Sequence, residues 1–542
     1  MPERFKHPPA FITSCYTTKI IMIYKTIYSQ YAALLFAVLN GSCSSSDTPK
    51  ESAPPVDATT VTLNIDDATA YQTIEHFGAS DAWSCQFVGK WPDAKKNAIA
   101  DLLFSQQNDA EGNPQGIGLS IWRFNVGAGS AEQGSASGIA DEWRRAESFL
   151  QPNGEYDWNR QQGQVWFANA AKQRGVGKLL IFPNSPPVSI TRNGKAYANV
   201  GLESNLAADK FNAYTDYLTS VTEGLQTMGL TVDYISPMNE PQWDWSDGGQ
   251  EGTPFYNNEI SQITTQLNQK LENKGLDSKI NIAEAGQINY LYEVGNKPGR
   301  SDQVKDFFVT GSANYVGNLS HLENAISGHS YFTTSAFDAA VAQRQQLNTA
   351  VSQVNGLKYW MSEYCILGDN AGEINGNGRD LGIEPALYLA RTIFTDLNVA
   401  QATAWHWWIA ISPYDYKDGL IYIDKQKENG NYYDSKMLWA LGNYSRFIRP
   451  GFKRVKIESS QSTAITKNFL FSSYKDPSTG KLVTVIVNSG NDAVNINLKK
   501  QGTALTGLKA YVTSSDKDLK VQNINNNEAF AVPARSIVTI TN

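Results

Sequence analysis

The feature that most constrains the fold is an alternation, from residue 74 onward, of short apolar segments with stretches of helical periodicity. The helical pattern is clearest at 205–228 and recurs at 257–274, 335–355 and 384–399. Eight apolar segments are predicted strands, at 75–83, 118–127, 178–187, 233–240, 279–287, 326–332, 358–365 and 402–408. Eight repeats of strand and helix predict an α/β fold, a (β/α)8 TIM barrel. An open doubly wound sheet has the same alternation and remains the alternative.

The two ends of the folded chain have a different pattern. After residue 447 the helical periodicity stops, and short alternating segments with turn signals such as DPSTGK predict a β-sandwich at 448–542. VTLNID alternates in the same way, so residues 61–73 are predicted to contribute a strand to that sandwich. We therefore expect a barrel at 74–447 beside a sandwich that both chain ends build.

Residues 1–42 have the pattern of an export signal. Lys25 precedes the apolar run YAALLFAVL at 31–39, and small residues follow the run. The run is too short to span a membrane. Translation could begin at Met22 instead of Met1. An uncleaved amphipathic tail is the alternative interpretation.

The cysteine that follows the apolar run resembles that of a bacterial lipoprotein signal. Cys43 comes after GS and precedes SSSDTPKESAPP, so it is the predicted lipidation site. Residues 43–60, rich in Ser, Pro, Thr and acidic side chains, are predicted to be a tether. We expect an exported protein that a lipid anchors to the bacterial outer membrane, on its periplasmic or its cell-surface face.

Composition excludes several classes of protein. A net charge of −7 without a basic stripe argues against nucleic-acid binding. The chain has no GxGxxG, GxxxxGK[ST] or HExxH motif and no zinc-type cysteine pairs, so we expect no cofactor and no metal. Cys85 and Cys365 are expected to be free thiols in a monomer. His76, His329 and His406 are expected to bond sugar or to belong to the core.

Two glutamates stand where predicted strands end. Glu240 (ISPMNEPQ) ends the fourth and Glu363 (YWMSEYC) ends the seventh. Catalytic groups of a (β/α)8 barrel lie at the carboxyl ends of its strands. Two carboxyl groups facing each other there could hydrolyse a glycosidic bond, because one donates a proton and the other attacks the anomeric carbon. The acid would need surroundings that raise its pKa.

Polar and aromatic residues end the neighbouring predicted strands. Arg123 could keep the nucleophile charged, Asn239 could bond a sugar hydroxyl, and the Tyr331 hydroxyl could orient the carboxylate of the seventh strand. A tryptophan of WHWW could form the floor of the sugar site. Two interpretations stay open for Glu284, which either supports the site or is a solvated turn residue. Trp243 either forms an outer subsite or packs its own loop. The predicted substrate-binding residues are Arg123, Asn239, Tyr331, Trp405, His406, Trp407, Asp81, Trp83, Asn184, His329, Trp243 and Glu284.

Several of these stretches resemble glycoside hydrolase family 30. FGASDAW, SPMNEPQ, WMSEY and above all ALGNYSRFIRPG before the terminal sandwich carry the resemblance, which extends over residues 60–542. It implies a retaining glycosidase with Glu240 as acid/base and Glu363 as nucleophile. It also implies a central subsite lined by Arg123, Asn239, Tyr331 and Trp405. FPNSPP departs from the SPWSPP-like form common in the family, because a tryptophan is missing.

The resulting expectation is a retaining β-glycoside hydrolase that acts on a β-linked polysaccharide. GASDAW and RFNVGAG are most similar to the endo-β-1,6-galactanase-like branch of the family. β-1,6-Glucanase, xylanase and exo-β-glycosidase activities stay open, and Arg192 is a conceivable contact for the uronic acid of glucuronoxylan. A catalytically dead glycan-binding lipoprotein is the alternative of another class, disfavoured because both glutamates and their polar neighbours are present.

Overall fold

The computed structural model describes residues 60–461, 466–525 and 528–542. The predicted export signal, the lipidation site Cys43 and the tether up to residue 59 lie outside the described residues. Within the described ranges, no helix combines the length and the apolar character that crossing a membrane requires.

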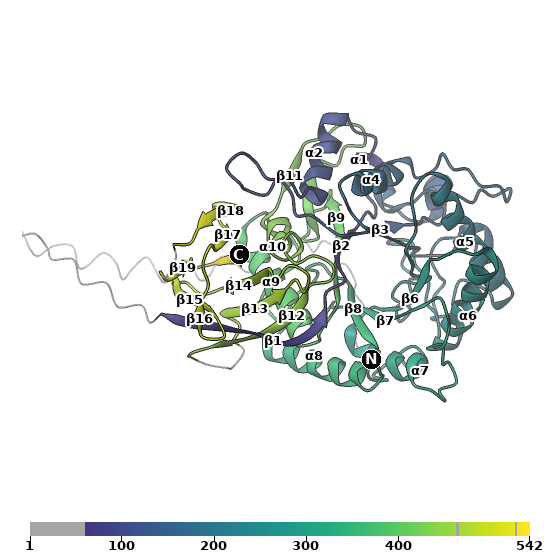
Figure 1. The fold of residues 1–542 in the computed structure, drawn as a ribbon. Helices are drawn as coiled ribbons and strands as arrows, with labels where there is room; N and C mark the ends of the chain where they lie inside the picture. Colours follow the sequence, from purple (N-terminus) through teal and green to yellow (C-terminus); the bar gives the residue numbers. More distant parts are fainter. Residues whose placement is uncertain (1–59, 462–465, 526–527) are drawn as a thin grey trace, which may run out of the picture. The chain divides into compact units, whose positions relative to one another are not determined.

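Eight parallel strands close into a barrel, which confirms the predicted fold and makes the open-sheet alternative wrong (Figure 1). Each strand pairs with the next along the chain, and the last pairs with both the seventh and the first. The barrel strands are β2 (His76–Ser80), β3 (Ile121–Asn125), β4 (Lys178–Phe182), β5 (Tyr234–Ile235), β6 (Lys279–Ala285), β7 (Leu322–His329), β8 (Lys358–Glu363) and β9 (Ala404–Ser412).

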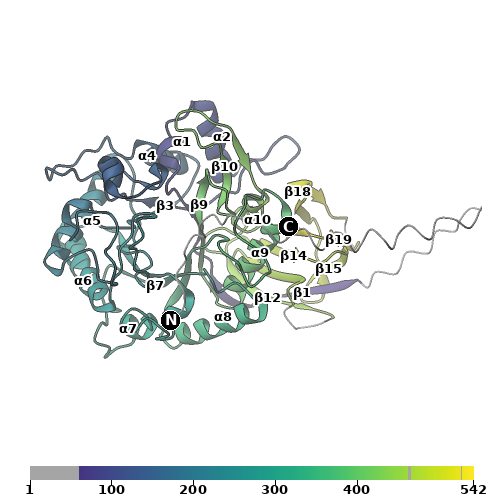
Figure 2. The ribbon, with the colours of Figure 1, turned by 180° about the vertical axis from the view of Figure 1, so that it is seen from behind.

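Helices lie on the outside of the barrel strands, as Figure 2 shows for α5 to α8. The α-helices are α1 (Cys85–Val88), α2 (Asp93–Phe104), α3 (Ser130–Gln133), α4 (Gln162–Gln173), α5 (Phe211–Thr227), α6 (Asn257–Lys274), α7 (Gln303–Phe308), α8 (Phe337–Ser352), α9 (Ile383–Asn398) and α10 (Lys436–Ser445). Short 3-10 helices occupy Gly134–Ser137, Glu142–Arg144, Val188–Ile190, Ala208–Lys210 and Ile288–Leu291.

Helix α6 shows why the periodicity was informative. Its buried apolar residues recur every three or four positions, at Ile260, Ile263, Leu267 and Leu271. The helix ends at Gly275, whose φ of 63° is left-handed and costs glycine little. One face therefore packs on the barrel while the other meets solvent.

β10 (Gly419–Ile423) and β11 (Tyr432–Asp434) extend the barrel sheet beside β9, and the other described strands form a second sheet that uses both chain ends. β1 (Val61–Thr73) pairs antiparallel with β12 and parallel with β15, which confirms the predicted contribution of the N-terminal strand. β13 and β14 form the hairpin predicted at DPSTGK. The other strands are β12 (Lys453–Ser459), β13 (Phe469–Lys475), β14 (Leu482–Asn488), β15 (Val494–Lys500), β16 (Thr503–Ala504), β17 (Lys509–Ser514), β18 (Lys517–Asn523), β19 (Phe530–Val532) and β20 (Ser536–Thr541).

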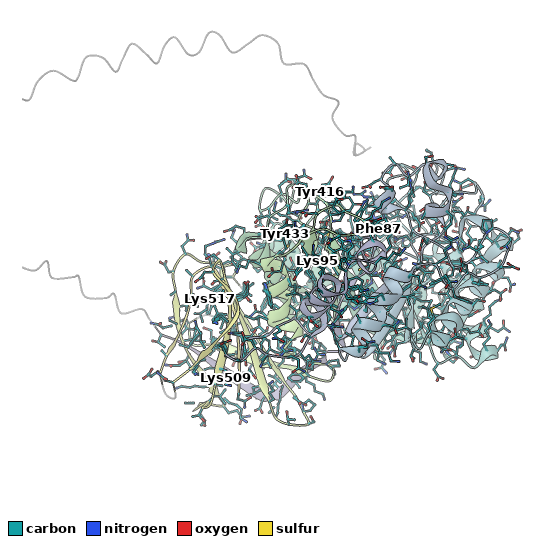
Figure 3. The ribbon with its side chains drawn as sticks, turned by 90° about the horizontal axis from the view of Figure 1, so that it is seen from above. Phe87, Lys95, Tyr416, Tyr433, Lys509 and Lys517 are labelled. Carbon is teal, nitrogen blue, oxygen red and sulfur yellow. The ribbon has the colours of Figure 1, made fainter. Side chains whose placement is uncertain are left out.

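The motif ALGNYSRFIRPG joins the sandwich to the barrel through α10. The Asn443 side-chain amide donates to the Thr539 hydroxyl of β20 at 3.0 Å, and that hydroxyl donates to the Asn443 carbonyl at 2.6 Å. Ser445 donates to the Ile117 carbonyl at 2.6 Å on the barrel side. The motif is thus an interdomain contact. In Figure 3, Lys509 and Lys517 mark the sandwich strands, and Phe87 and Lys95 mark α1 and α2 beside the barrel.

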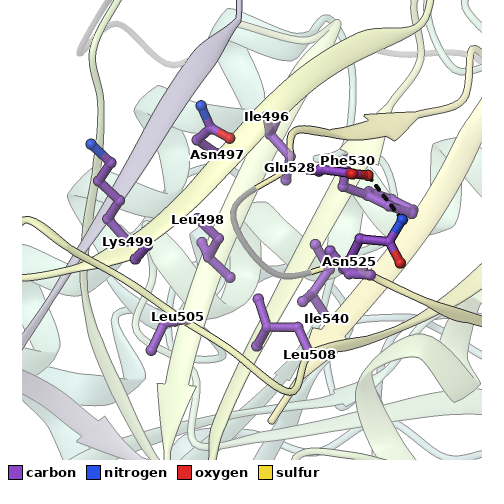
Figure 4. A pocket seen from close by; sticks show the side chains of 12 residues that line it. Ile496, Asn497, Leu498, Lys499, Leu505, Leu508, Asn525, Glu528, Phe530 and Ile540 are labelled. Atoms are coloured by element: carbon purple, nitrogen blue, oxygen red, sulfur yellow. Dashed lines mark hydrogen bonds between the residues drawn. The ribbon is translucent and has the colours of Figure 1, made fainter.

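The sandwich has a pocket of about 150 Å³ between its strands (Figure 4). Its lining is mainly aliphatic, with Phe530 as its aromatic side chain, and Asn525 donates to Glu528 across it at 2.9 Å. Sugar sites usually combine aromatic faces with several free polar groups. This lining is therefore consistent with a structural role for the sandwich.

Candidate active site

Glu240 and Glu363 meet at the mouth of the barrel. Glu363 is the last residue of β8, and Glu240 follows β5, three strands away around the ring. One carboxyl oxygen of each, together with one ring nitrogen of His329, all lie within 4.8 Å of one another. Glu240 is 7% exposed and Glu363 is 3% exposed. The fold thus brings together two carboxyl groups that are 123 positions apart in the sequence.

The backbone of Glu240 fixes where its carboxyl group points. Its φ of 44° is left-handed, a conformation that is uncommon for a residue with a side chain. Its N–H donates to the carbonyl of Glu284, which itself has a φ of 50°, at 2.9 Å. The Glu240 carbonyl accepts from the Trp243 N–H at 3.2 Å and from the Trp245 indole at 3.1 Å. These bonds hold the strained turn in place.

Glu363 is surrounded by donors. The Arg123 guanidinium donates to Oε2 at 3.1 Å, and the Tyr331 hydroxyl donates to Oε1 at 3.1 Å. Both are hydrogen bonds that a carboxylate oxygen accepts. They also orient the group, since each oxygen has its own partner. This is the environment that an anionic nucleophile requires.

Glu284 supports the site from below the reacting groups and is fully buried, so the solvated-turn alternative is wrong. Its Oε2 accepts from Ser362 at 2.8 Å and lies 3.5 Å from Arg123 Nη2. Its Oε1 accepts from Ser236 at 2.9 Å. Burial acts to raise the pKa of Glu284, but the Arg123 charge and a bond from His329 outweigh burial and lower it to about 2. Glu284 therefore supplies a permanent negative charge.

His329 links the three glutamates. Its Nδ1 lies 2.9 Å from Glu240 Oε1 and its Nε2 lies 2.8 Å from Glu284 Oε2. Burial acts to lower the pKa of His329, but the charges and hydrogen bonds of the three glutamates raise it to about 10. The imidazole is therefore a cation near neutral pH and donates from both nitrogens.

Burial and charge balance distinguish Glu240 from the other two glutamates. Burial raises the pKa of Glu240, and the charges of Glu363 and Glu284 act in the same direction, against the pull of His329. With Glu240 protonated, two carboxylates face the two cations Arg123 and His329, and the cluster is neutral. Glu240 is then a proton donor beside a charged Glu363.

Among the described residues, Glu240, His329 and Glu363 have side-chain atoms close enough together to hold a metal ion. Glu240, His329 and Glu363 would supply one ligand atom each. A histidine must be neutral to ligate a metal, whereas the raised pKa of His329 keeps this ring protonated. The contacts therefore favour a hydrogen-bonded ion cluster over a metal centre.

Two predicted substrate-binding amides lie at the mouth with unsatisfied polar atoms. Asn184 follows β4 and is 2% exposed, and neither atom of its amide has a partner among the residues described. Asn239 precedes Glu240, is 3% exposed, and leaves its Oδ1 unpaired in the same sense. Buried polar atoms are normally hydrogen-bonded, and a missing bond costs about 1–3 kcal/mol. Sugar hydroxyls would complete both groups.

Comparison with known families decides the assignment. Residues 60–422 match the family model described as O-Glycosyl hydrolase family 30, and residues 451–540 match the Glycosyl hydrolase family 30 beta sandwich domain. The chain belongs to glycoside hydrolase family 30. It is a glycoside hydrolase, and its substrate is a polysaccharide or an oligosaccharide.

Relatives of this glycoside hydrolase have several activities. An endo-beta-1,6-galactanase of Hypocrea rufa is 24% identical over 82% of this chain and 84% of its own length. The glucuronoxylanase XynC of Bacillus subtilis is also 24% identical, over 81% of this chain and 85% of its own. A solved conserved exported protein from Bacteroides fragilis is 33% identical with a TM-score of 0.82, covering 89% of this chain and 100% of its own.

Within this family 30 fold, the prediction that Trp405 and Trp407 line the sugar site is wrong. Both are fully buried. The Trp405 indole donates to Asp396 of α9 at 2.9 Å, and the Trp407 indole donates to a backbone carbonyl at 2.7 Å. His406 contacts His76 inside the barrel at 2.9 Å and is a core group, not a sugar contact. Side chains alternate along a strand, so the neighbours of an inward His406 face the outer helices.

The tryptophan that faces the mouth is Trp408, which the sequence analysis missed. The pairing of β9 with β2 shifts by one residue after Trp407, because Trp408 is an extra residue in the strand. Its ring lies 5.4 Å from that of Trp83 and 6.3 Å from that of Phe182. Trp408 lies two residues after the inward His406, so alternation along WHWW was the available signal for its direction.

Asp81 is tied to the backbone of the neighbouring strand. Its Oδ1 accepts from the Asn125 N–H at 2.7 Å and from Gln164 at 3.2 Å, while its buried Oδ2 has no partner in the described part of the chain. Burial raises the pKa of Asp81 to about 8, so the acid is mostly neutral at pH 7. It can then donate a hydrogen bond from Oδ2.

Trp243 lies on the Glu240 side of the mouth and is half-buried. It packs against Gly286, where an added Cβ would come within 2.5 Å of the indole nitrogen. The Lys297 ammonium lies 5.2 Å above its ring, and the 50% exposed Phe332 lies 6.5 Å away. This partly open aromatic surface favours the outer-subsite interpretation over loop packing.

The remaining predicted residues divide between core and surface. Cys85 and Cys365 are buried and unpaired, which confirms the prediction of free thiols. Cys365 Sγ lies 3.8 Å from the Tyr331 hydroxyl, close to the reacting groups. Arg192 is exposed, so it offers a uronic acid no preformed site.

Proposed function

We propose that this enzyme hydrolyses β-glycosidic bonds with retention, through a covalent glycosyl–enzyme intermediate on Glu363. The supporting observation is the separation of the reacting groups, since an oxygen of Glu240 and one of Glu363 lie within 4.8 Å. Retaining enzymes hold their carboxyl groups about 5–5.5 Å apart, and inverting enzymes about 6.5–9.5 Å. The space at this mouth suits direct attack and is too small for an intervening water.

In the first step, Glu240 protonates the glycosidic oxygen while the Glu363 carboxylate attacks the anomeric carbon. The bond from that carbon to the leaving oxygen breaks, the leaving alcohol departs, and an ester to Glu363 forms. Arg123 and Tyr331 hold the nucleophile in place. In the second step, Glu240 takes a proton from water, the water attacks the same carbon, and the Glu363 carboxylate is released.

The proposed substrate is a β-linked polysaccharide, with β-1,6-galactan first. Support comes from the endo-beta-1,6-galactanase relative, which aligns over more than four fifths of both chains. The glucuronoxylanase relative has the same identity, so xylan is the second substrate to test. Asn184 replaces the missing tryptophan of strand three with a hydrogen-bonding group, which suits selection by hydroxyl orientation.

We also propose that the protein is an exported monomer with a lipid on Cys43. The exported character of the Bacteroides fragilis relative supports export. Labelled palmitate incorporated into the full chain, but not into a Cys43→Ser variant, in a diderm bacterial host would support the anchor. Equal labelling, or secretion of both chains without membrane association, would contradict it.

The decisive experiment follows anomeric protons by NMR during hydrolysis of β-1,6-galactan, β-1,6-glucan and glucuronoxylan. Wild type should release product that first appears as the β-anomer, and Glu363→Gln should release none. Glu458→Gln, an exposed carboxylate of the sandwich, is the matched control and should match wild type. Initial formation of the α-anomer would overturn the retaining mechanism, and turnover of another glycan would replace galactan as substrate.

A further inference from the structure

Five residues form a surface on the side of the mouth that lies away from Glu240. In the ring of eight strands, β9 stands opposite β5, and its neighbours are β8 and β2. Segments that follow β2, β3 and β9 converge here, and β10 (Gly419–Ile423) extends the sheet beside the end of β9. We call this surface the glycone wall, and its residues are Trp83, Arg144, Trp408, Tyr414 and Asp418.

The glycone wall is built from aromatic rings in edge-to-face contact and one guanidinium. The Arg144 guanidinium lies 5.4 Å from the centre of the Trp83 ring and 5.0 Å from that of Tyr414. Trp83 also meets Trp408 edge to face at 5.4 Å. Gly419 pairs with Ile409 in the parallel β9–β10 ladder, so Asp418 stands beside Trp408 and shares its side of the sheet.

Four polar atoms of this surface are buried without a hydrogen-bond partner among the described residues. They are the Trp83 indole nitrogen, Arg144 Nε, the Tyr414 hydroxyl and Asp418 Oδ1. Trp83 and Asp418 are each only 5% exposed. Burial raises the pKa of Asp418 to about 6. Two donors, one acceptor and a hydroxyl that can do either, all open beside aromatic rings, are the complement of a sugar ring with free hydroxyls.

The direction of the reaction identifies which sugar unit of the substrate would reach the glycone wall. Glu240 protonates the leaving oxygen, so the leaving part of the substrate lies on the Glu240 side. The sugar that reacts with Glu363 must then extend the other way, toward β9 and β2. We propose that the glycone wall binds the sugar unit linked to the reacting one on the non-reducing side, with Asp418 and Arg144 on its hydroxyls and Trp83 at its face.

This inference rests on the retaining mechanism proposed above and adds a requirement to it. The enzyme should need two sugar units on the nucleophile side, and it should release a disaccharide or a longer product instead of a monosaccharide. At pH 7.5 the Arg144 guanidinium and the Asp418 carboxylate carry opposite charges, so the wall has no net charge to offer an ionic sugar, and the unit is an uncharged hexose or pentose.

The test compares aryl β-glycosides that carry one and two β-1,6-linked galactose units, or the matching pair for the glycan that wild type cleaves. At pH 7.5, Asp418→Asn should lower kcat/KM for the two-unit substrate about tenfold, because a charge-assisted bond becomes a neutral one. It should leave the one-unit substrate within twofold. Trp83→Phe keeps an aromatic ring and removes the indole donor. It should also lower kcat/KM for the two-unit substrate only, by a smaller factor than Asp418→Asn.

Equal loss on both substrates, or no loss on either, would overturn the assignment. A binding measurement separates this failure from failure of the proposed function. Calorimetry with the two-unit sugar on Glu363→Gln, with and without Asp418→Asn, needs no turnover. Weaker binding in the double variant supports the glycone wall even if the reaction differs, and unchanged or absent binding refutes it. Glu458→Gln again serves as the control.

Discussion

Two buried charge clusters of this protein lie near each other and have opposite designs. The mouth cluster comprises Arg123, Glu240, Glu284, His329 and Glu363. The outer cluster lies between α8, α9 and β9 and comprises Ser330, Arg344, Asp396 and Trp405. The two are joined through the chain, because Ser330 directly follows His329.

The outer cluster has one cation, one anion and no vacant position on the anion. Asp396 Oδ1 accepts from Arg344 at 2.8 Å, its Oδ2 accepts from Trp405 at 2.9 Å, and Ser330 donates to both oxygens. Arg344 and Asp396 are fully buried. Burial of such a pair is tolerated because every group has a partner. The cluster fixes the segment that carries Tyr331, and each oxygen of Asp396 already accepts two hydrogen bonds.

The mouth cluster has three carboxyl groups for two cations. Two of them can be ionised at no net charge, and burial raises the pKa of the third, Glu240. The comparison teaches that the surplus carboxyl group, not burial or charge alone, distinguishes the reactive site from the structural one. Substitutions in the two clusters should therefore separate activity from stability.

The largest effect is expected for Glu363→Gln. Removal of the nucleophile should lower kcat at least about a thousandfold, because no covalent intermediate can form. The midpoint of thermal unfolding should stay within a few degrees, since the amide still accepts from Tyr331. Full activity in the variant would show that another group attacks the anomeric carbon. Initial rates and a melting curve measure both quantities.

Glu240→Gln should follow, with a loss that depends on the leaving group. A general acid contributes about 10²–10⁴-fold, so a natural glycoside should lose that much activity. An aryl glycoside with an acidic phenol departs without protonation, and its glycosylation rate should change far less. Equal losses for both substrates would contradict the role of Glu240 as proton donor.

Asp396→Asn should act on stability instead. It leaves the Arg344 charge buried without its partner, a change that costs about 3–5 kcal/mol of unfolding free energy. Chemical denaturation measures that loss. The fraction that stays folded should keep the wild-type pH profile. A changed profile without loss of stability would mean that the outer cluster takes part in the reaction.

Trp405→Phe tests the corrected orientation of the two buried tryptophans. Loss of the indole donor to Asp396 should cost about 1 kcal/mol of stability and leave KM unchanged. Trp408→Phe is the comparison variant and should raise KM with little change in stability. If Trp405→Phe raised KM as much as Trp408→Phe, the assignment of Trp405 to the outer face would fail.

The smallest expected effect is a shift in the pH profile. Glu240 must be protonated to act, and burial raises its pKa, so activity should fall with rising pH only above the ordinary glutamate range. The Glu284 charge contributes to the raised pKa of Glu240. Glu284→Gln should therefore move the alkaline limb of kcat/KM to lower pH, by less than about one unit. A shift to higher pH would contradict this charge balance.

The sequence predicted the elements whose signals are local. The eightfold alternation gave the barrel, VTLNID and the terminal strands gave the shared sandwich, and Glu240 and Glu363 were found because strand ends are visible as apolar runs that stop. Their proximity followed from the fold class alone, since a closed parallel barrel brings all strand ends to one rim.

The barrel, the sandwich and the two glutamates at the rim could be read from the chain, because periodicity and strand ends depend on neighbouring residues. The faces of the β9 tryptophans needed the fold, since apolar residues cover both sides of this strand, and the alternation has a known direction only once His406 is placed inside the barrel. The fold also decided which carboxyl group has the raised pKa. That depends on burial and on partners such as Arg123 and His329, which the chain supplies from distant strands.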